Sequence, residues 1–169
     1  MSYTRIPGGM ISRRVAIGMI SAATIALAAS GALAQETFKM GGIMSMTGGG
    51  ASIGRTASEG WKLAVEAINA DGGILGKQVE LVLADTMTDP THGVSEARRL
   101  IENEKVQALV GPATSQETIP IVAVATEGKV MQVSTAASSQ LTPEVGPFHF
   151  STSVTAANQM IPNIDFAID

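Results

Sequence analysis

The sequence predicts an α/β fold in which a parallel sheet carries flanking helices. Short apolar segments, typical of buried strands, alternate with longer segments whose apolar residues recur at helical spacing. Such alternation favours parallel pairing with right-handed crossovers. The expected strands span residues 38–45, 78–84, 106–110, 130–134 and 148–151. The expected helices span residues 56–70, 91–104, 115–127 and 156–169.

The first expected helix has the clearest helical pattern. Its apolar stripe consists of Ala57, Trp61, Ala64, Val65 and Ile68. Their spacing places these residues on one face of a helix. Gly72 and Gly73 should end the helix, because glycine readily adopts the left-handed conformation found at helix ends.

The first 34 residues predict a secretory signal peptide. Three arginines precede an uninterrupted small and apolar run at residues 15–29, and Ala32-Leu33-Ala34 then provides a small-x-small cleavage site. We therefore expect ordinary export, cleavage after Ala34 and a mature periplasmic protein that begins at residue 35. The apolar run is short for a membrane span, and an uncleaved membrane anchor is the alternative.

The chain beyond residue 34 is acidic and contains no cysteine. It holds 8 of the 11 basic residues and all 15 acidic ones, which gives a formal net charge of −7. This charge opposes binding to nucleic acid and to anionic membrane surfaces. The lack of cysteine excludes a disulfide framework, a catalytic thiol and a lipid-modified cysteine at the cleavage site.

Two loops at the carboxyl edge of the expected sheet collect small hydroxyl residues, and parallel sheets bind ligands at this edge. The first loop, at residues 111–115, ends with Thr114 and Ser115 directly before a helix. The unpaired N–H groups of a helix start attract anions such as a carboxylate, and both hydroxyls can donate beside them. Simple capping of the helix by Ser115 is the alternative.

The second loop, at residues 134–139, complements the first. Backbone carbonyls and hydroxyls of the stretch Ser134-Thr135-Ala136-Ala137-Ser138-Ser139 suit an ammonium group. With donors in one loop and acceptors in the other, the sequence predicts a site for a small zwitterion.

A glycine-rich segment, GGASIGRT, nearly matches a phosphate-binding loop between a strand and a helix. Asp85 resembles the magnesium-binding partner of such a loop. However, Arg55 stands where the motif requires a lysine, and arginine does not replace that lysine conservatively. Nucleotide hydrolysis is therefore the disfavoured alternative, and we interpret this segment as the lining of a cleft.

Other catalytic and metal-binding patterns are weak. His92 and His149 lack the spacing of metal ligands. Asp85 and Asp89 fit loop capping better than an acid–base pair, and Trp61 fits the core better than a ligand platform. The sequence shows no nucleophile–base pair, so it predicts a protein that is not an enzyme and uses no cofactor or metal.

Three stretches carry a family resemblance. They are GRTASEGWKLAVEAINADGGILGKQVELVLADTMTDP, EARRLIENEKVQALVGPATS and VSTAASSQLT. In order and spacing they resemble the branched-chain amino acid-binding proteins of ABC importers, over residues 39–154. The resemblance implies a type I periplasmic binding fold of two similar lobes that close over a ligand. It makes residues 35–169 the N-terminal lobe of a solute-binding domain, truncated before the second lobe.

The resemblance also implies roles for individual residues. Ser115 would hydrogen-bond the ligand carboxylate, and Ala136 would offer its backbone to the amino group. Ser138 takes the place of a family threonine whose hydroxyl serves the same group. The loop at residues 45–54 would border the side-chain pocket near Ile53.

The chain departs from the family pattern in two places besides the second lobe. Thr135 stands where family members often have proline followed by glycine or alanine, and Gly49-Gly50 thins the first loop. These departures concern the pocket, which determines specificity.

The family resemblance implies a soluble binding component that delivers an amino acid to an ABC permease in the inner membrane. A monomer is expected at full length. The alternatives are a binding protein or sensor with the same fold for amides, urea or aromatic acids.

Overall fold

The computed structural model describes residues 37–156, 158–161 and 166. The chain divides into one unit at residues 1–35 and a second at residues 36–169, and the fold below is that of the second unit. The expected signal peptide lies outside the described residues. Within them, no helix combines the length and the apolar character that crossing a membrane requires.

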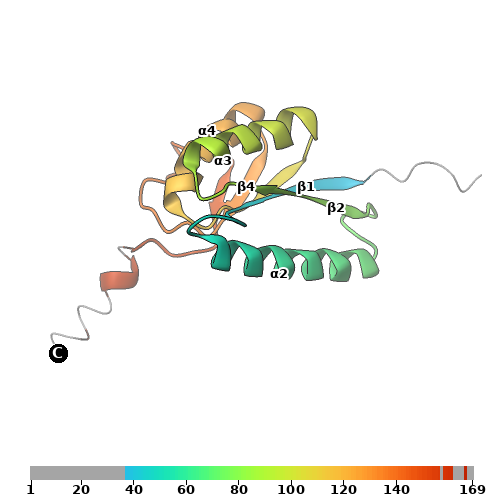
Figure 1. Ribbon diagram of the computed structural model, residues 1–169, viewed down its shortest axis with the longest axis horizontal. Helices are drawn as coiled ribbons and strands as arrows, with labels where there is room; N and C mark the ends of the chain where they lie inside the picture. The colour runs from blue at the N-terminus through green and yellow to red at the C-terminus, as the bar shows by residue number, and fades with distance from the viewer. Residues whose placement is uncertain (1–36, 157, 162–165, 167–169) are drawn as a thin grey trace, which may run out of the picture. The chain divides into compact units, whose positions relative to one another are not determined.

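Five parallel strands form one sheet, which confirms the predicted fold class (Figure 1). The strands are β1 (Phe38–Met44), β2 (Val79–Asp85), β3 (Ala108–Val110), β4 (Met131–Ser134) and β5 (His149–Ser151). Their order in the sheet is β2-β1-β3-β4-β5. Every expected strand is present, and the third is two residues shorter at its start than the sequence predicts.

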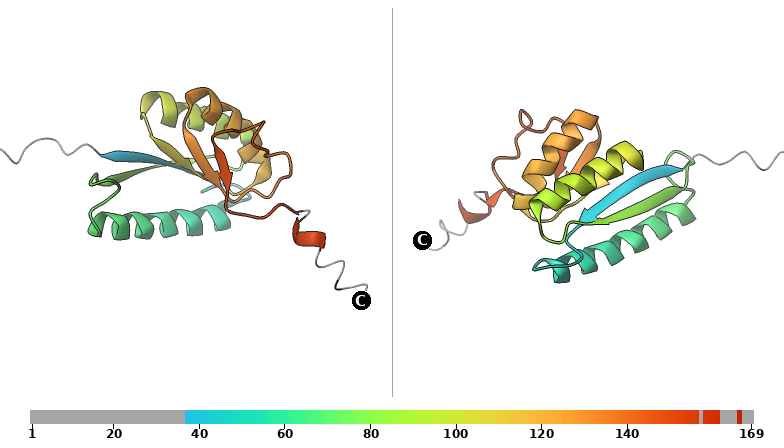
Figure 2. Two further views of the ribbon diagram at one scale, coloured as in Figure 1. Left: turned by 180° about the vertical axis from the view of Figure 1, so that it is seen from behind. Right: turned by 45° about the horizontal axis from the view of Figure 1, so that its top comes forward.

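Helices cover the two faces of the sheet unequally, as Figures 1 and 2 show. One face carries α2 (Ala51–Ala70). The other carries α3 (Pro90–Arg98), which continues into the π-helical turn η1 (Arg99–Asn103), and α4 (Ser115–Gly128). The described residues 156, 158–161 and 166 are helical, in agreement with the last expected helix, whose other residues lie outside the described ones.

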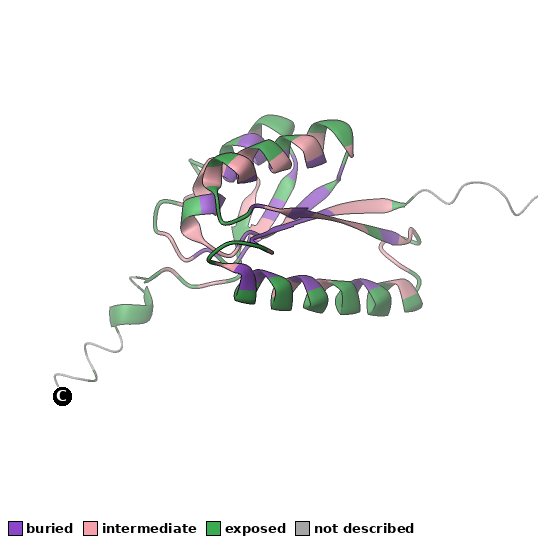
Figure 3. Cartoon of the chain, in the orientation of Figure 1, coloured by how far each residue is buried: buried purple, intermediate pink, exposed green. Residues whose placement is uncertain are grey.

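The principal core lies between the sheet and the α3–α4 layer. Fully buried aliphatic side chains from both layers meet there, including Ile43 of β1, Leu109 of β3, Leu100 of η1 and Ile121 of α4. Each such side chain contributes about 1.5–3 kcal/mol when it leaves water. In Figure 3, the buried residues follow the strands and the sheet-facing sides of the helices.

The predicted boundaries and burial of α2 were partly wrong. The helix begins at Ala51 rather than at residue 56, and its buried residues are Ala51, Gly54, Ser58 and Val65. Ala64 and Ile68 of the predicted stripe are exposed. Because Gly54 has no side chain, the first turn of the helix lies directly against the carbonyl group of Ser45.

Two glycines of α2 provide a matched test of this close approach. A Cβ at Gly54 would lie 1.9 Å from the carbonyl oxygen of Ser45, whereas a Cβ at Gly60 would meet nothing within 4 Å. We expect Gly54→Ala to lower the free energy of unfolding by about 1–3 kcal/mol through overpacking. Gly60→Ala should raise it by about 0.5–1 kcal/mol through helix propensity. Urea unfolding measures both, and similar effects of the two substitutions would contradict the close approach.

Candidate functional site

The carboxyl ends of the parallel strands bring the loops after β1, β2, β3 and β4 to one edge of the sheet. β3 and β4 are neighbours, with Val110 paired to Val133. The loop that leads to Ser115 and the loop that contains Ser138 therefore leave adjacent strands at the same edge. The structure brings together the two loops that the sequence predicted to act together.

The first turn of α4 separates the roles of Thr114 and Ser115. Thr114 is the N-cap residue, and its hydroxyl oxygen accepts from the N–H of Glu117 at 3.4 Å. The side chain of Ser115 has no hydrogen-bond partner among the described residues, nor do the N–H groups of Ser115 and Gln116. The alternative that Ser115 merely caps the helix is therefore wrong, since Thr114 is the cap.

A buried carboxyl group, missed at the sequence level, underlies this turn. Glu117 is 1% exposed, and hydroxyls from three separate segments converge on it. The Ser45 hydroxyl lies 2.8 Å from Oε1 and 3.0 Å from Oε2. The Thr86 hydroxyl also donates to Oε1, and the Thr114 hydroxyl to Oε2. The sequence signal was Thr-x-x-Glu, a capping-box spacing, but that pattern does not reveal the partners that follow β1 and β2.

The second turn is held by hydroxyls of β4 and β5. The Ser134 hydroxyl accepts from the N–H of Ala136 at 3.2 Å and lies 2.9 Å from Nε2 of His149. The Ser151 hydroxyl donates to the carbonyl of Ala136 at 2.9 Å. Burial lowers the pKa of His149, which favours its neutral form. Ser151 and His149 are thus structural partners that sequence analysis did not assign to the site, whereas Ser134 belongs to the predicted loop and holds its backbone.

The predicted acceptors in this turn are already partly engaged. The carbonyl of Ala137 accepts from the N–H of Ala156 at 3.0 Å, and the hydroxyl oxygen of Ser138 accepts from the N–H of Gln140 at 3.2 Å. A carbonyl oxygen has two lone pairs, so Ala136 and Ala137 each retain acceptor capacity.

Ile53 lies in the first turn of α2, not in a loop as the sequence predicted. Its side chain is 59% exposed, and with Ser52, Thr56 and Ala57 it lines a shallow hollow. The loop after β1 is shorter than expected because the helix already begins at Ala51.

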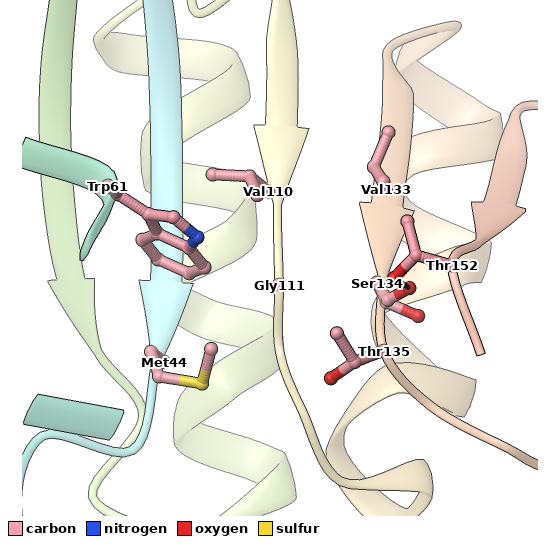
Figure 4. A pocket seen from close by; sticks show the side chains of 8 residues that line it. All are labelled: Met44, Trp61, Val110, Gly111, Val133, Ser134, Thr135 and Thr152. Carbon is pink, nitrogen blue, oxygen red and sulfur yellow. Dashed lines mark hydrogen bonds between the residues drawn. The ribbon is translucent and has the colours of Figure 1, made fainter. Parts of the chain in front are cut away.

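A cavity of about 180 Å³ opens at the carboxyl ends of β1, β3 and β4 (Figure 4). Its lining comprises Met44, Trp61, Val110, Gly111, Val133, Ser134, Thr135 and Thr152. In Figure 4 the Trp61 ring and the Met44 side chain form one wall, and the threonine hydroxyls lie across from them. The Trp61 ring packs against Gly42 of β1 and against Gly111, which follows β3, and it also lines this cavity.

Hydrogen bonds to Asp85 and Thr88 hold the loop that leads into the glycine-rich segment. The N–H groups of Met46, Thr47 and Met87 donate to Oδ1 of Asp85, and the Thr47 hydroxyl donates to Oδ2 at 2.6 Å. The N–H of Gly50 donates to the Thr88 hydroxyl at 3.0 Å. Asp85 therefore anchors the loops that follow β1 and β2.

Asp89 likewise has a structural role as the N-cap of α3, accepting from the N–H of His92 at 2.6 Å. In the part of the chain that the structure describes, no three His, Cys, Asp or Glu side chains gather where they could hold a metal ion.

Comparisons with known proteins identify the family to which this fold and site belong. A family model described as periplasmic binding protein matches residues 37–169. The chain belongs to the periplasmic binding protein family. The resemblance to branched-chain amino acid-binding proteins that the sequence suggested is confirmed by the relatives below.

The Leu/Ile/Val-binding protein BraC3 of Rhizobium johnstonii is 37% identical over 71% of this chain and 32% of its own length. The branched-chain amino acid transporter substrate binding protein LivJ from Streptococcus pneumoniae, solved with isoleucine, is 36% identical with a TM-score of 0.68. That match covers 71% of this chain and 34% of LivJ. The chain thus spans about a third of the length of these relatives.

A third relative was solved with a different ligand. It is a solute binding protein of an ABC transporter from Rhodopseudomonas palustris BisB5, in complex with 3,4-dihydroxy benzoic acid. It is 32% identical, with a TM-score of 0.63, over 70% of this chain and 32% of its own. Family members with this lobe therefore differ in what they bind.

Asp85 provides a pH-dependent test of the loop anchor. Partial burial opposes ionisation, but the Thr47 hydroxyl and the N–H groups of Met87, Thr47 and Met46 outweigh it, so that the pKa of Asp85 is lowered. The ionised Asp85 side chain therefore contributes its full stabilisation above the pKa of an aspartate in the unfolded chain. This contribution is lost as the pH falls through the lower pKa of the folded state.

We expect Asp85→Asn to cost about 1 kcal/mol of unfolding free energy at pH 7, because the amide NH₂ cannot accept from Thr47. The difference from the wild type should shrink as the pH falls below about 4. Asp71→Asn, at an exposed position, is the control. Urea unfolding across this pH range measures the effect; a difference that stays constant with pH would contradict it.

Proposed function

We propose that this chain supplies the carboxylate-binding edge of an extracytoplasmic solute-binding component of an ABC importer, with a branched-chain or related amino acid as ligand. The observation that carries this proposal is the first turn of α4. There the hydroxyl and N–H of Ser115 and the N–H of Gln116 lack partners among the residues that the structure describes, while the neighbouring hydroxyl of Thr114 is engaged.

The ligand carboxylate binds at this turn. A helix start carries unpaired N–H donors and a partial positive charge, which favour an anion. The Ser115 hydroxyl adds a neutral donor beside them. Thr114, the other predicted donor, contributes its backbone, because its hydroxyl already bonds Glu117.

The ligand ammonium binds at the second turn. Ala136 and Ala137 retain one acceptor lone pair each on their carbonyls, and the Ser138 hydroxyl stands in the same turn. The exposed side chain of Ile53 borders the aliphatic part of the ligand. Both turns lie at the same sheet edge, which supports simultaneous contact with the two ends of a zwitterion.

The rest of the site belongs to a second lobe. In this proposal residues 1–34 are a signal peptide, and residues 35–169 form the first lobe of a monomeric periplasmic protein that delivers its ligand to an inner-membrane permease. The matched segment covers only 32% and 34% of two relatives' own lengths, which supports this division. Lobe closure supplies further contacts and excludes water, and the role is one of binding, not of catalysis.

An aromatic acid is the second candidate ligand. The relative solved with 3,4-dihydroxy benzoic acid supports it. Such an acid shares the carboxylate and lacks the ammonium group, so it would use the turn at Ser115 and leave the acceptors of the second turn without a cation.

Calorimetry on the full-length gene product tests the ligand class. We expect binding of leucine and valine, with Ser115→Ala weakening the affinity at least tenfold, equivalent to about 1.4 kcal/mol, through loss of a hydrogen bond to a charged group. Ser95→Ala, at an exposed position of α3, is the control and should leave affinity unchanged. Binding of benzoate or urea without leucine, or full affinity in Ser115→Ala, would refute the proposal.

A further inference from the structure

The buried polar side chains of the described chain gather beneath the carboxyl edge of the sheet. They are Ser45, Thr86, Glu117, Thr118, Gln132 and Ser134, with Ser58 of α2 as the remaining one. Glu117 is the one acidic side chain among them, and it forms no ion pair with any described residue. Among the described residues, hydroxyl groups alone donate to its carboxyl oxygens.

The three hydroxyls that bond Glu117 come from segments far apart in the sequence. Ser45 follows β1, Thr86 follows β2, and Thr114 precedes α4. Ser45 and Thr86 also contact each other, with their hydroxyl oxygens 3.1 Å apart. One side chain thereby fixes three loops relative to one another. We call these three hydroxyls and the Glu117 carboxyl the carboxyl hub.

The carboxyl hub also determines which hydroxyls at the edge remain available to a ligand. The hydroxyls of Ser45 and Thr114 are bonded to the carboxyl group beneath the edge. The hydroxyl of Ser115, the next residue along the chain, is left without a partner among the described residues. The position of Ser115 relative to a ligand thus depends on the hydrogen bond between the Thr114 hydroxyl and the Glu117 carboxyl group.

We propose that Glu117 is a positioning residue that locks the first turn of α4 to the loops after β1 and β2, so that the edge is preformed before a ligand arrives. This rests on the proposed function, because it concerns the turn that carries Ser115. Preformed loops lower the ordering cost of binding. Glu117 acts through Thr114 and Ser115 and does not itself touch the ligand.

The number of acceptors explains why a carboxyl group stands at this position. Three hydroxyls donate to two oxygen atoms, each with two lone pairs. In Glu117→Gln, one of these oxygens becomes an NH₂ group, which can only donate. Whichever oxygen is replaced, at least one of the three hydroxyls then faces a donor instead of an acceptor. The side-chain volume changes little.

Hydrogen exchange by mass spectrometry on the full-length gene product tests the hub without any ligand. In Glu117→Gln and Thr114→Val, we expect amide exchange to accelerate about tenfold or more in the segments at 45–50, 86–89 and 111–116 together. Thr114→Ser keeps the hydroxyl and should restore slow exchange. Thr126→Val is the control on the same helix, because the Thr126 hydroxyl is buried without a hydrogen-bond partner.

Two results would overturn the proposal. Acceleration confined to the first turn of α4 would mean that Glu117 serves only as a local cap. Acceleration spread evenly over the chain would mean that it supports only global stability. Thr114→Val keeps the outcome decisive if Glu117→Gln fails to fold, because it removes one hydroxyl and leaves the carboxyl group in place.

A double-mutant cycle then links the hub to binding. Glu117→Gln should weaken leucine affinity about tenfold, and adding it to Ser115→Ala should cost almost nothing more, because both act through the same turn. Additive losses would overturn the positioning role. If the wild type binds neither leucine nor valine, the proposed function fails, whereas the exchange pattern still decides whether the hub exists.

Discussion

The buried carboxyl group of Glu117 is the constraint on which the geometry of the sheet's carboxyl edge depends. A polar group taken out of water is costly unless it finds hydrogen-bond partners. Glu117 finds them in Ser45, Thr86 and Thr114, which belong to three different loops. The carboxyl group is therefore satisfied only when β1, β2 and α4 are all in their native positions. Through this single side chain, the shape of the edge depends on the correct packing of elements from the whole lobe.

Some polar groups at this edge hold the loops in place through hydrogen bonds, and others remain available to a ligand. Asp85 collects N–H groups from two loops, and Ser134 and Ser151 fix the turn at Ala136. The Ser115 hydroxyl remains unpaired among the described residues. Two adjacent residues that both carry a hydroxyl group, Thr114 and Ser115, thereby have a structural role and a proposed binding role respectively. Similar divisions are expected wherever a site must be rigid without a ligand.

Local sequence patterns were sufficient to predict the strands, the parallel sheet and the two loops at its carboxyl edge. Apolar runs and the glycines after α2 carry that information over short distances. They did not reveal the start of α2, because Gly54 contacts the carbonyl of Ser45 across the loop. Nor did they identify the role of Glu117, whose partners Ser45 and Thr86 lie 72 and 31 residues away. Ile53 was misplaced for the same reason, since the helix start decides its environment.

The central claim is that the first turn of α4 and the turn at residues 136–138 bind one small solute together. An amide NMR titration of the isotope-labelled full-length gene product with leucine tests it most directly. We predict that the resonances of Ser115, Gln116 and Ala137 shift in parallel at the same leucine concentrations. A shift in one turn without the other, or shifts centred on the outer surface of α3, would contradict it.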